Sequence, residues 1–299
     1  MSIGFIGLGN MGNPIARNII RNGFELKVYD INRKAAYNLI ALGAVWSDSI
    51  SNLTYSSDVI ITSLPGPSEV KEVALSHDGL LESARKDSIW IDLTTNSPFL
   101  VKQLSKIAES RGIHFLECPV SQAVDGAESG TLSIFVSGKH EIFSKCLPLF
   151  NIIGNKIFYL GNNFGTGNTA KLLTNLLWFV HAAAIGEALS IGAKSGIDLE
   201  MLADIIRNSA GDSWVAKHDI PSIYAGNYDP SFTLDLCCKD LKLVRELAAD
   251  MGIPLNMGLL AESLFQKARA IYGGDKPELF VVKMLEDETG IKLNLEKAK

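Results

Sequence analysis

The sequence predicts an α/β domain over residues 1–162, then a long linking helix at about 166–194 within an all-helical domain over 163–299. Three observations favour this division. Up to about Leu160, short β-rich runs alternate with amphipathic segments, which is typical of a largely parallel sheet covered by helices. After Gly167, helical patterns separated by Gly or Pro replace the strand signals. A chain of 299 residues, 47% hydrophobic and 20% charged, has the length and apolar content for two folded cores.

The predicted strands are short apolar runs, and those of the first domain are Met1–Ile6, Glu25–Tyr29, Asp58–Thr62, Ser88–Asp92, His114–Glu117, Leu132–Val136 and Lys156–Tyr159. Helical segments are expected between them, as at Pro98–Arg111 and His140–Phe150. In the second half, punctuation by Gly and Pro predicts helices over Asp198–Asn208, Leu234–Asp250, Pro254–Tyr272 and Pro277–Asp287. In such a sheet, ligands are expected beyond the carboxyl ends of the strands.

The first strand leads directly into a glycine-rich turn, Gly7-Leu8-Gly9-Asn10-Met11-Gly12, with the spacing G-x-G-x-x-G. In a dinucleotide-binding turn the first glycine permits the tight bend and the second lets the backbone approach a pyrophosphate. The third lets helix and strand pack closely. The following helix, expected from about Asn13 to Asn22, would direct its first N–H groups at the phosphates. An ordinary glycine-rich turn can share this spacing, but the position between strand and helix favours nucleotide binding.

Asp30 ends the second predicted strand, at the place where a ribose-binding carboxylate belongs. A carboxylate there accepts hydrogen bonds from both ribose hydroxyls of NAD and repels the 2′-phosphate of NADP. Arg33 is near enough in sequence to hold such a phosphate, or it is a solvated arginine in the first turn of the next helix. The sequence therefore favours NAD and leaves NADP open.

Composition excludes several other classes of protein. A net charge of −5 and a pI of about 5.6 argue against a nucleic-acid-binding surface. The four cysteines form no C-x-x-C pair, so no zinc site, other metal site or redox motif is indicated, and a reducing, cytoplasmic setting is expected. The chain enters a strand at once, which predicts no signal or transit peptide. Its longest apolar stretch, Leu172–Ile185, is too short and too polar for a bilayer span.

Turn-forming or polar residues follow three more predicted strands. Leu64 and Pro65 lie in an exit suited to a wall of the cofactor site, and Thr95 is placed to hydrogen-bond near the nicotinamide. Both exits are equally typical of plain strand-to-helix turns. The third exit is a long segment of small residues, in which Ser121 and adjacent backbone N–H groups are candidates for binding a substrate carboxylate. A structural Ω-like loop would have similar composition.

Lys171 and Asn175 are four residues apart on the expected linking helix, so they share one face. A solvated lysine is the simplest interpretation of Lys171, but the surrounding helix is apolar nearly all round, which predicts burial. A buried lysine needs a partner or a lowered pKa, and a lysine with a lowered pKa is able to give a proton to a forming alkoxide. Asn175 would then orient the hydroxyl of the substrate.

With these motifs in place, the chain resembles the β-hydroxyacid dehydrogenase family, which includes 3-hydroxyisobutyrate dehydrogenase and tartronate semialdehyde reductase. The resemblance covers the whole chain in order. Its segments are Phe5–Pro14 for the opening signature, Pro119–Ser121 with Gly126-Ala127 and Gly130–Leu132 for the substrate loop, Gly165–Asn175 for the catalytic motif, and Phe232–Leu241 for a later lysine segment.

The resemblance implies an N-terminal Rossmann domain and a helical C-terminal domain that contributes to a homodimer or homotetramer. It implies Lys171 as general acid and base, with Ser121 and Asn175 on the substrate. The residues that it implies around the dinucleotide, beyond the glycine turn, are Asn10, Met11, Leu64, Pro65, Thr95 and Lys239. The run from Asp30 through Asn32 and Arg33 looks more like the NAD-preferring members.

One departure from the family pattern concerns the substrate loop. Members usually have Ser-Gly-Gly where this chain has Ser121-Gln122-Ala123. A Cβ and a carboxamide therefore stand where two glycines let backbone N–H groups approach a carboxylate, and the strain is larger if φ is positive. We expect Gln122 and Ala123 to remodel the carboxylate site, with Gln122 contacting an additional polar group of the substrate.

The resulting prediction is an NAD-dependent enzyme that interconverts a small β-hydroxyacid and its semialdehyde, with Lys171 moving the proton. One alternative is an NADPH-dependent semialdehyde or glyoxylate reductase of the same fold. The other is a non-catalytic dinucleotide-binding scaffold, which the presence of Lys171 disfavours. No nucleic-acid or membrane partner is expected.

Overall fold

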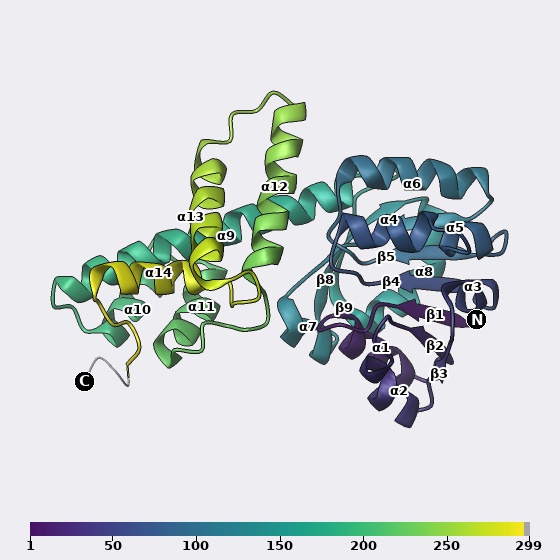
Figure 1. Ribbon diagram of the computed structural model, residues 1–299, viewed down its shortest axis with the longest axis horizontal. Helices are drawn as coiled ribbons and strands as arrows, with labels where there is room; N and C mark the ends of the chain where they lie inside the picture. The colour runs from purple at the N-terminus through teal and green to yellow at the C-terminus, as the bar shows by residue number, and fades with distance from the viewer. Residues whose placement is uncertain (296–299) are drawn as a thin grey trace. The chain divides into compact units, whose positions relative to one another are not determined.

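The computed structural model describes residues 1–295 and divides the chain into two compact units, Met1–Lys171 and Leu172–Lys299 (Figure 1). Unit 1 contains the sheet and unit 2 is helical. Helix α9, Thr166–Lys194, begins in unit 1 and continues into unit 2, so the chain divides inside this helix. The boundary that the sequence predicts, at 162–163, stays a prediction.

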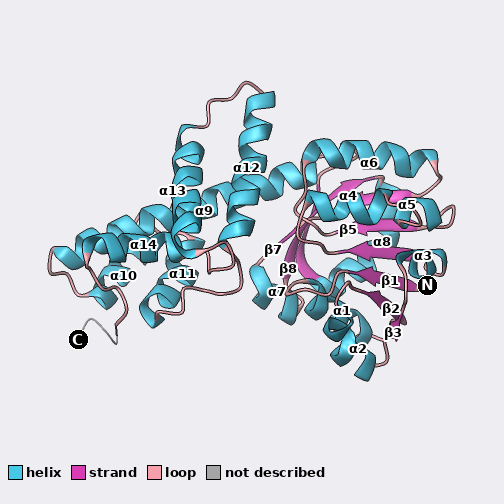
Figure 2. Ribbon diagram, viewed as in Figure 1, coloured by secondary structure: helices cyan, strands magenta, loops and turns pink. Residues whose placement is uncertain are grey.

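Unit 1 is built on a sheet with the strand order β3-β2-β1-β4-β5-β6-β8-β7, and β9 pairs with β8 (Figure 2). Its strands are β1 (Ile3–Ile6), β2 (Leu26–Tyr29), β3 (Val45–Trp46), β4 (Val59–Thr62), β5 (Ile89–Asp92), β6 (His114–Glu117), β7 (Val120–Ser121), β8 (Leu132–Gly138) and β9 (Gly154–Tyr159). The six strands from β3 to β6 in this spatial order, which include β2, β1, β4 and β5, are parallel to one another. Strand β8 is antiparallel to β6 and β7. The expected parallel-dominated α/β domain is confirmed.

The central strands are apolar because helices cover both faces of the sheet. Successive side chains point to opposite faces, so Phe5 joins the core on one side and Ile6 the core on the other. Ile91 and Trp90 in β5 divide in the same way. This two-sided burial explains why β1 and β4 are continuous apolar runs without polar alternation.

The helices of unit 1 are α1 (Gly12–Arg21), the short 3-10 helix η1 (Arg33–Ala36), α2 (Tyr37–Ala41), α3 (Ile50–Tyr55), α4 (Pro67–Leu75), α5 (Leu80–Ser83), α6 (Pro98–Ser110), α7 (Ala123–Ser129) and α8 (His140–Ile153). Helices α1 and α8 supply Ile15 and Leu149 to one core. Helices α4 and α6 supply Val70 and Val101 to the other. The sheet is thus the middle layer of three in this unit.

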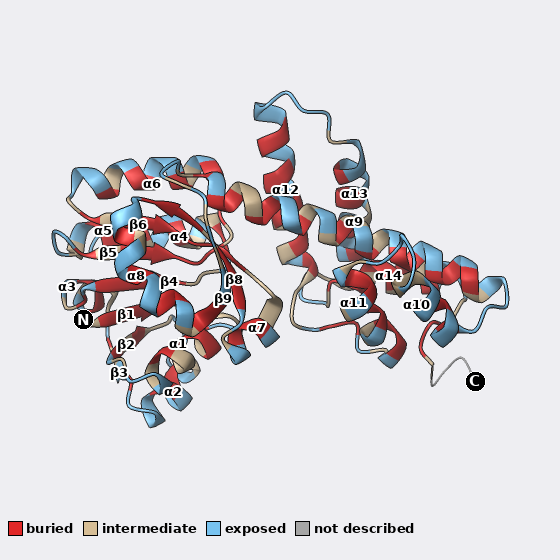
Figure 3. Cartoon of the chain, turned by 180° about the vertical axis from the view of Figure 1, so that it is seen from behind, coloured by how far each residue is buried: buried red, intermediate tan, exposed pale blue. Residues whose placement is uncertain are grey.

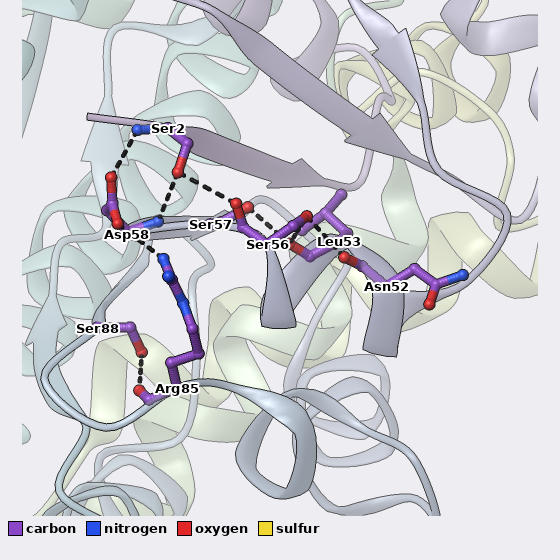
Figure 4. A network of polar contacts seen from close by, with 8 residues as sticks. All are labelled: Ser2, Asn52, Leu53, Ser56, Ser57, Asp58, Arg85 and Ser88. Atoms are coloured by element: carbon purple, nitrogen blue, oxygen red, sulfur yellow. Dashed lines mark hydrogen bonds and ion pairs between the residues drawn. The ribbon is translucent and has the colours of Figure 1, made fainter.

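A polar network ties the amino ends of β1 and β4 together (Figure 4). The backbone N–H of Ser2 donates to Asp58 Oδ2 at 2.8 Å, and Arg85 Nη2 donates to Asp58 Oδ1 at 2.7 Å. The Ser2 hydroxyl donates to the carbonyl of Ser56 at 3.1 Å. The backbone hydrogen bond from Ser2 lowers the pKa of Asp58, with Arg85 adding to it. These contacts hold the amino ends of β1 and β4 together, whereas ligands of such sheets bind beyond the carboxyl ends of the strands.

Unit 2 consists of the rest of α9 with α10 (Leu199–Arg207), α11 (Trp214–Ala225), α12 (Leu234–Asp250), α13 (Asn256–Tyr272) and α14 (Phe280–Thr289). The described residues of this unit contain no strand, although Thr233 and Pro277 form an isolated bridge. Its core gathers the inward faces of these helices around Phe179, Leu234 and Phe265. Figure 3 shows the buried and exposed sides alternating along each helix.

Three expectations from the sequence need correction. The small-residue segment after Ser121 was expected as a loop, but it contains α7. Helix α11 was not expected, because Pro221 interrupts its pattern. Helix α9 is not buried all round: Leu173 is 50% exposed and Leu177 is 58% exposed.

Helix α9 is also long and apolar enough to cross a membrane by length and composition alone. The apolar run Leu172–Ile185, which was predicted to be too short and too polar for a bilayer span, covers only part of this helix. The same test is passed by core helices of soluble proteins, and α9 places Phe179 and Leu189 in the core of unit 2. Membrane insertion gains little support from this helix.

Candidate active site

The glycine turn between β1 and α1 has the close approaches that the motif predicts. Gly7 has a φ of +94°, and an added Cβ would lie 2.2 Å from the carbonyl oxygen of Ser63. A Cβ on Gly12 would lie 2.0 Å from the carbonyl oxygen of Gly7. Gly9, in contrast, has no atom within 4 Å of an added Cβ. The open space at Gly9 fits a pyrophosphate lying against the backbone before α1.

Asp30, at the end of β2, faces this turn. Its Oδ2 accepts a hydrogen bond from the Leu8 N–H at 2.7 Å, and its Oδ1 accepts one from the Asn32 N–H at 2.7 Å. The Asn32 side chain in turn accepts from the Lys34 N–H and begins η1. Each carboxylate oxygen keeps a further lone pair for a ribose hydroxyl. The residues present therefore fit a dinucleotide.

Arg33 lies over the ring of Trp46, with 5.4 Å between the guanidinium carbon and the ring centroid. This cation–π contact holds the Arg33 side chain against β3. A role for Arg33 at a 2′-phosphate stays a prediction.

The exits of β4 and β5 are joined by side chains. The Leu64 N–H donates to Thr94 Oγ1 at 3.0 Å, which fixes the turn that precedes Pro65. Pro65 is exposed and Thr95 is half-buried at the neighbouring exit. Both residues lie at the carboxyl ends of the strands, where the prediction requires them, and their contact with a cofactor stays a prediction.

Beneath these exits runs a buried chain of hydrogen bonds that the sequence did not reveal. Trp90 Nε1 donates to Thr62 Oγ1 at 2.9 Å, and that hydroxyl donates to Asp92 Oδ1 at 2.8 Å. Asn96 Nδ2 donates to Asp92 Oδ2 at 3.2 Å, and the Asn96 N–H donates to Asn168 Oδ1 at 2.5 Å. The chain links β4 and β5 to the first turn of α9. Burial raises the pKa of Asp92, against the effect of these hydrogen bonds.

Glu117, at the end of β6, caps the same helix. Its Oε2 accepts from the Gly165 N–H at 2.7 Å, and its Oε1 accepts from the Asn168 N–H at 2.6 Å and from Asn168 Nδ2 at 2.8 Å. The side chain is fully buried, and this burial raises the pKa of Glu117 despite the hydrogen bonds. A carboxyl group beside the first N–H groups of a helix satisfies donors that have no partner inside the helix. Glu117 thereby sets where the first turns of α9 lie.

Lys171 follows this cap on α9 and is 8% exposed, so the predicted burial is confirmed. Asn175, one turn later, is 2% exposed. Residues four apart share a helix face, so these two side chains lie one above the other. Their use by a substrate stays a prediction.

In unit 2, Asp240 connects two of the predicted site residues. Its Oδ2 accepts a hydrogen bond from Asn175 Nδ2 at 2.7 Å, and its Oδ1 lies 3.2 Å from Lys239 Nζ. Asp240 itself is 1% exposed. Asp240 is not among the site residues predicted from the sequence, although it lies in the segment Phe232–Leu241 that resembles the family.

The Ser121 segment differs from a simple loop. Ser121 pairs with Ser133 in the β7–β8 ladder, and α7 begins two residues later. Gln122 and Ala123 both have positive φ values, 94° and 51°. Side chains therefore stand at backbone angles that favour glycine, and the strained case considered for this departure is the one observed.

The fold and the glycine turn are matched by comparison with known proteins. Residues 2–161 match the family described as the NAD binding domain of 6-phosphogluconate dehydrogenase. Residues 165–285 match the family described as the NAD-binding of NADP-dependent 3-hydroxyisobutyrate dehydrogenase. Together with the geometry around Gly9 and Asp30, these matches define an NAD(P)-binding oxidoreductase.

Individual relatives narrow the class. The 3-hydroxyisobutyrate dehydrogenase of Pseudomonas aeruginosa is 34% identical over 270 residues, covering 88% of this chain and 90% of the relative. The 2-(hydroxymethyl)glutarate dehydrogenase of Eubacterium barkeri is 32% identical, with 98% of each chain covered. A crystal structure of 3-hydroxyisobutyrate dehydrogenase from Salmonella typhimurium superimposes with a TM-score of 0.87 at 27% identity, covering 95% of this chain and 99% of that one. The chain belongs to the β-hydroxyacid dehydrogenase family and is a dehydrogenase of hydroxyacids.

Proposed function

We propose that the enzyme is NAD-dependent and interconverts a small β-hydroxyacid and its semialdehyde, with Lys171 as general acid and base. The observation that carries the proposal is the buried lysine one helical turn before Asn175, on a helix that Glu117 anchors to the nucleotide-binding sheet. Dehydrogenation of an alcohol requires a hydride acceptor and a proton acceptor. The two matched halves of the chain carry residues suited to each.

The proton is assigned to the Lys171 ammonium group. In the oxidising direction, neutral Nζ takes the proton of the substrate hydroxyl while the carbinol C–H leaves as hydride. In the reducing direction, the ammonium returns the proton to the forming alkoxide. The nicotinamide, when bound, accepts or supplies that hydride at its carbon 4.

Asn175 is assigned to positioning the hydroxyl. Its amide nitrogen donates to Asp240, which leaves its Oδ1 as the acceptor available to a substrate hydroxyl. The buried Asp240 therefore selects the orientation of the amide. Lys239, which pairs with the same carboxylate, is assigned to the dinucleotide.

The substrate carboxylate is assigned to Ser121 and the backbone N–H groups that follow it. With side chains at Gln122 and Ala123, this anion site differs from the glycine pair that most members carry. The Eubacterium barkeri relative is named for a substrate with two carboxyl groups, so substrate size varies among relatives of this identity. We assign Gln122 to a polar group beyond the reacting carbon.

Gln122→Gly tests this assignment. We expect the variant to alter the ranking of hydroxyacid substrates, because the carboxamide is lost and the backbone is freed. The free energy of unfolding should rise by up to about 1 kcal/mol, since a side chain at positive φ costs roughly 1–2 kcal/mol. Asp87→Gly is the control, because Asp87 has a φ of 65° in an exposed turn before β5. An unchanged ranking in Gln122→Gly, with Asp87→Gly behaving like wild type, would remove Gln122 from the substrate site.

NADP is the competing cofactor, and two observations favour keeping it in the tests. One matching family is described as NADP-dependent, and Arg33 lies next to the strand end that holds Asp30. With NADPH, the same lysine and hydride chemistry would reduce a semialdehyde or glyoxylate. The carboxylate of Asp30 opposes a 2′-phosphate, so NAD is preferred in the proposal.

Asp30→Ala should shift the ratio of kcat/KM for NAD over NADP by about tenfold or more toward NADP, since 1.4 kcal/mol of lost discrimination is tenfold. The ratio is the correct readout, because losing the hydrogen bonds to the Leu8 and Asn32 N–H groups disturbs the binding of both cofactors. A ratio that stays at its wild-type value would assign cofactor choice to another residue.

The direct test is absorbance of the reduced nicotinamide with NAD and NADP against a panel of hydroxyacids. The panel contains 3-hydroxyisobutyrate, 3-hydroxypropionate, 4-hydroxybutyrate, glycerate and serine, with the semialdehydes and glyoxylate in reverse. Turnover with NAD and one β-hydroxyacid is the expected result. Binding of both cofactors without turnover of any compound would contradict the proposal and favour a scaffold.

Self-association is proposed from the exposed side of α9. Its apolar residues recur at helical spacing, and they are Leu173, Leu177, Ala184, Ala188 and Ile191. A stripe of this kind along a helix is typical of a surface that another chain covers. A homodimer or homotetramer is proposed on this basis, and sedimentation velocity measures it. A cytoplasmic location is likewise proposed.

A further inference from the structure

A cluster of ionisable side chains lies in unit 2, apart from the residues assigned to catalysis. His218 and Asp219 are on α11, and Asp229 is in the segment that leads to α12. The ligand atoms of these three residues all lie within 4.8 Å of one another. His218 Nδ1 is 2.9 Å from Asp219 Oδ1 and 3.9 Å from Asp229 Oδ2. In a tetrahedral zinc site with bonds of about 2.1 Å, ligand atoms lie about 3.4 Å apart, which is between these two distances.

The cluster is enclosed, unlike most groups of acidic residues. The Asp219 side chain is fully buried, and those of Asp229 and His218 are 11% and 30% exposed. His218 also stacks on Trp214, with 4.0 Å between ring centroids. Among the described residues, His218 is the one basic side chain at ion-pair distance from either aspartate, and an imidazole is charged only when it is protonated. Two carboxylates in so little water need more positive charge than one imidazole supplies.

Glu278 is a second unusual carboxyl group in the same part of unit 2. It is fully buried, and neither of its carboxyl oxygens has a hydrogen-bond partner in the described part of the chain. Its backbone N–H donates to the Phe232 carbonyl at 2.9 Å, which places it beside the segment that begins with Asp229. A buried carboxyl with no donor is costly unless it is protonated or binds a cation.

A hydrogen bond to one oxygen of each aspartate fixes the orientation of its carboxylate. Trp178 Nε1 donates to Asp219 Oδ2 at 3.1 Å, which leaves Oδ1 directed at His218. The Asp229 Oδ1 accepts from the Ser231 N–H at 2.9 Å, which leaves its Oδ2 toward the same imidazole. Metal-binding carboxylates commonly have their second oxygen held in this way.

We propose that His218, Asp219 and Asp229 bind one divalent transition-metal ion of the Zn²⁺ type, with the buried Glu278 as an additional carboxyl in the same part of unit 2. An imidazole nitrogen with carboxylate oxygens is a donor set that suits such an ion. The ion joins α11 to the segment before α12, and through Trp178 it stiffens the aromatic cluster of Trp178 and Trp214. Its role is structural, and it takes no part in the hydride or proton steps.

The experiment uses the full-length chain without an affinity tag, stripped with EDTA and titrated with ZnCl₂ by calorimetry. We expect one Zn²⁺ per chain with micromolar or tighter affinity, together with a higher Tm. X-ray absorption of the loaded protein should show one imidazole and otherwise oxygen ligands. The absence of binding at millimolar Zn²⁺ would overturn the proposal.

Asp229→Asn is the main variant, because Asp229 has a φ of 48° and Asn adopts such angles readily. It should weaken Zn²⁺ binding by at least about tenfold. Asp78→Asn is the matched control, since His77 Nδ1 lies 3.1 Å from Asp78 Oδ2 in an adjacent pair that is exposed and lacks the further carboxylates. Equal affinity in Asp229→Asn and wild type would place the ion elsewhere and refute the site.

Glu278→Gln tests whether Glu278 is a charged carboxylate that favours the ion or a protonated core residue. If the Glu278 charge helps to hold the ion, the variant binds Zn²⁺ more weakly and its Tm rises less on loading. If both Glu278→Gln and Asp229→Asn leave the Zn²⁺ affinity unchanged, Glu278 is a protonated core residue and the proposal is wrong. Because calorimetry and Tm need no substrate, this result does not depend on the proposed hydroxyacid chemistry.

Discussion

Lys171→Ala should lower kcat by about 10²–10⁴-fold, the range typical for loss of a general acid or base. The affinity for the dinucleotide should stay close to the wild-type value, because the glycine turn and Asp30 are at other strand ends. Lys171 is buried on α9, so its removal takes away the proton carrier assigned to the hydroxyl. The measurement is steady-state turnover together with cofactor binding by fluorescence.

Lys194→Ala is the control for this prediction, since Lys194 is an exposed lysine in the last turn of the same helix. It should behave like wild type. Lys171→Arg adds a second comparison, because arginine keeps the charge but cannot give up its proton. Turnover retained in Lys171→Ala would show that the proton moves through another group.

Glu117→Gln should reduce the free energy of unfolding by about 2–3 kcal/mol, because a buried hydrogen-bonding group left without a partner costs about 1–3 kcal/mol. The carboxyl accepts three hydrogen bonds from Gly165 and Asn168 with its two oxygens. An amide has one acceptor oxygen, and its NH₂ would face a backbone N–H. Urea unfolding measures the loss, and kcat should fall as well because the first turns of α9 carry Lys171.

Glu109→Gln is the control for the cap, since Glu109 is an exposed glutamate whose ion pair with Lys139 lies at the surface. Exposed pairs of this kind contribute about 0–1 kcal/mol. A stability loss in Glu117→Gln no larger than in Glu109→Gln would mean that the cap does not hold the helix.

The central strands were predictable because burial on both faces of the sheet makes them continuous apolar runs in the sequence. The expected strand His114–Glu117 agrees with β6, and the expected helix Leu234–Asp250 agrees with α12. Helix α7 was missed because Gly126 and small neighbours resemble a loop, and α11 because Pro221 breaks its pattern. Propensity and periodicity describe local preference, which tertiary packing overrides in these two segments.

The candidate site also has a part that was predictable from the sequence and a part that was not. Lys171 and Asn175 were predictable because their spacing on one helix is a local property. The acids that position their helix and the Asn175 amide were not predictable: Glu117 contacts Asn168 across 51 residues, and Asp240 contacts Asn175 across 65. Such pairings depend on the folded chain, and neither acid has a sequence neighbour that reveals its partner. The strain at Gln122 was posed as an alternative, which only the backbone angle decides.

The division of the chain inside α9 has a consequence for recombination between relatives. The contact boundary falls between Lys171 and Leu172, so the lysine is inherited with the nucleotide-binding half and Asn175 with the helical half. A chimaera joined ahead of α9 would separate Glu117 from the backbone that it caps, unless the incoming helix supplies the same donors. A junction just after Lys171 keeps the Glu117 cap and the proposed proton carrier from one parent. It exchanges Asn175, Asp240 and the aromatic cluster together, so the pair proposed to position the hydroxyl moves as one piece while the Ser121 segment stays with the nucleotide-binding half.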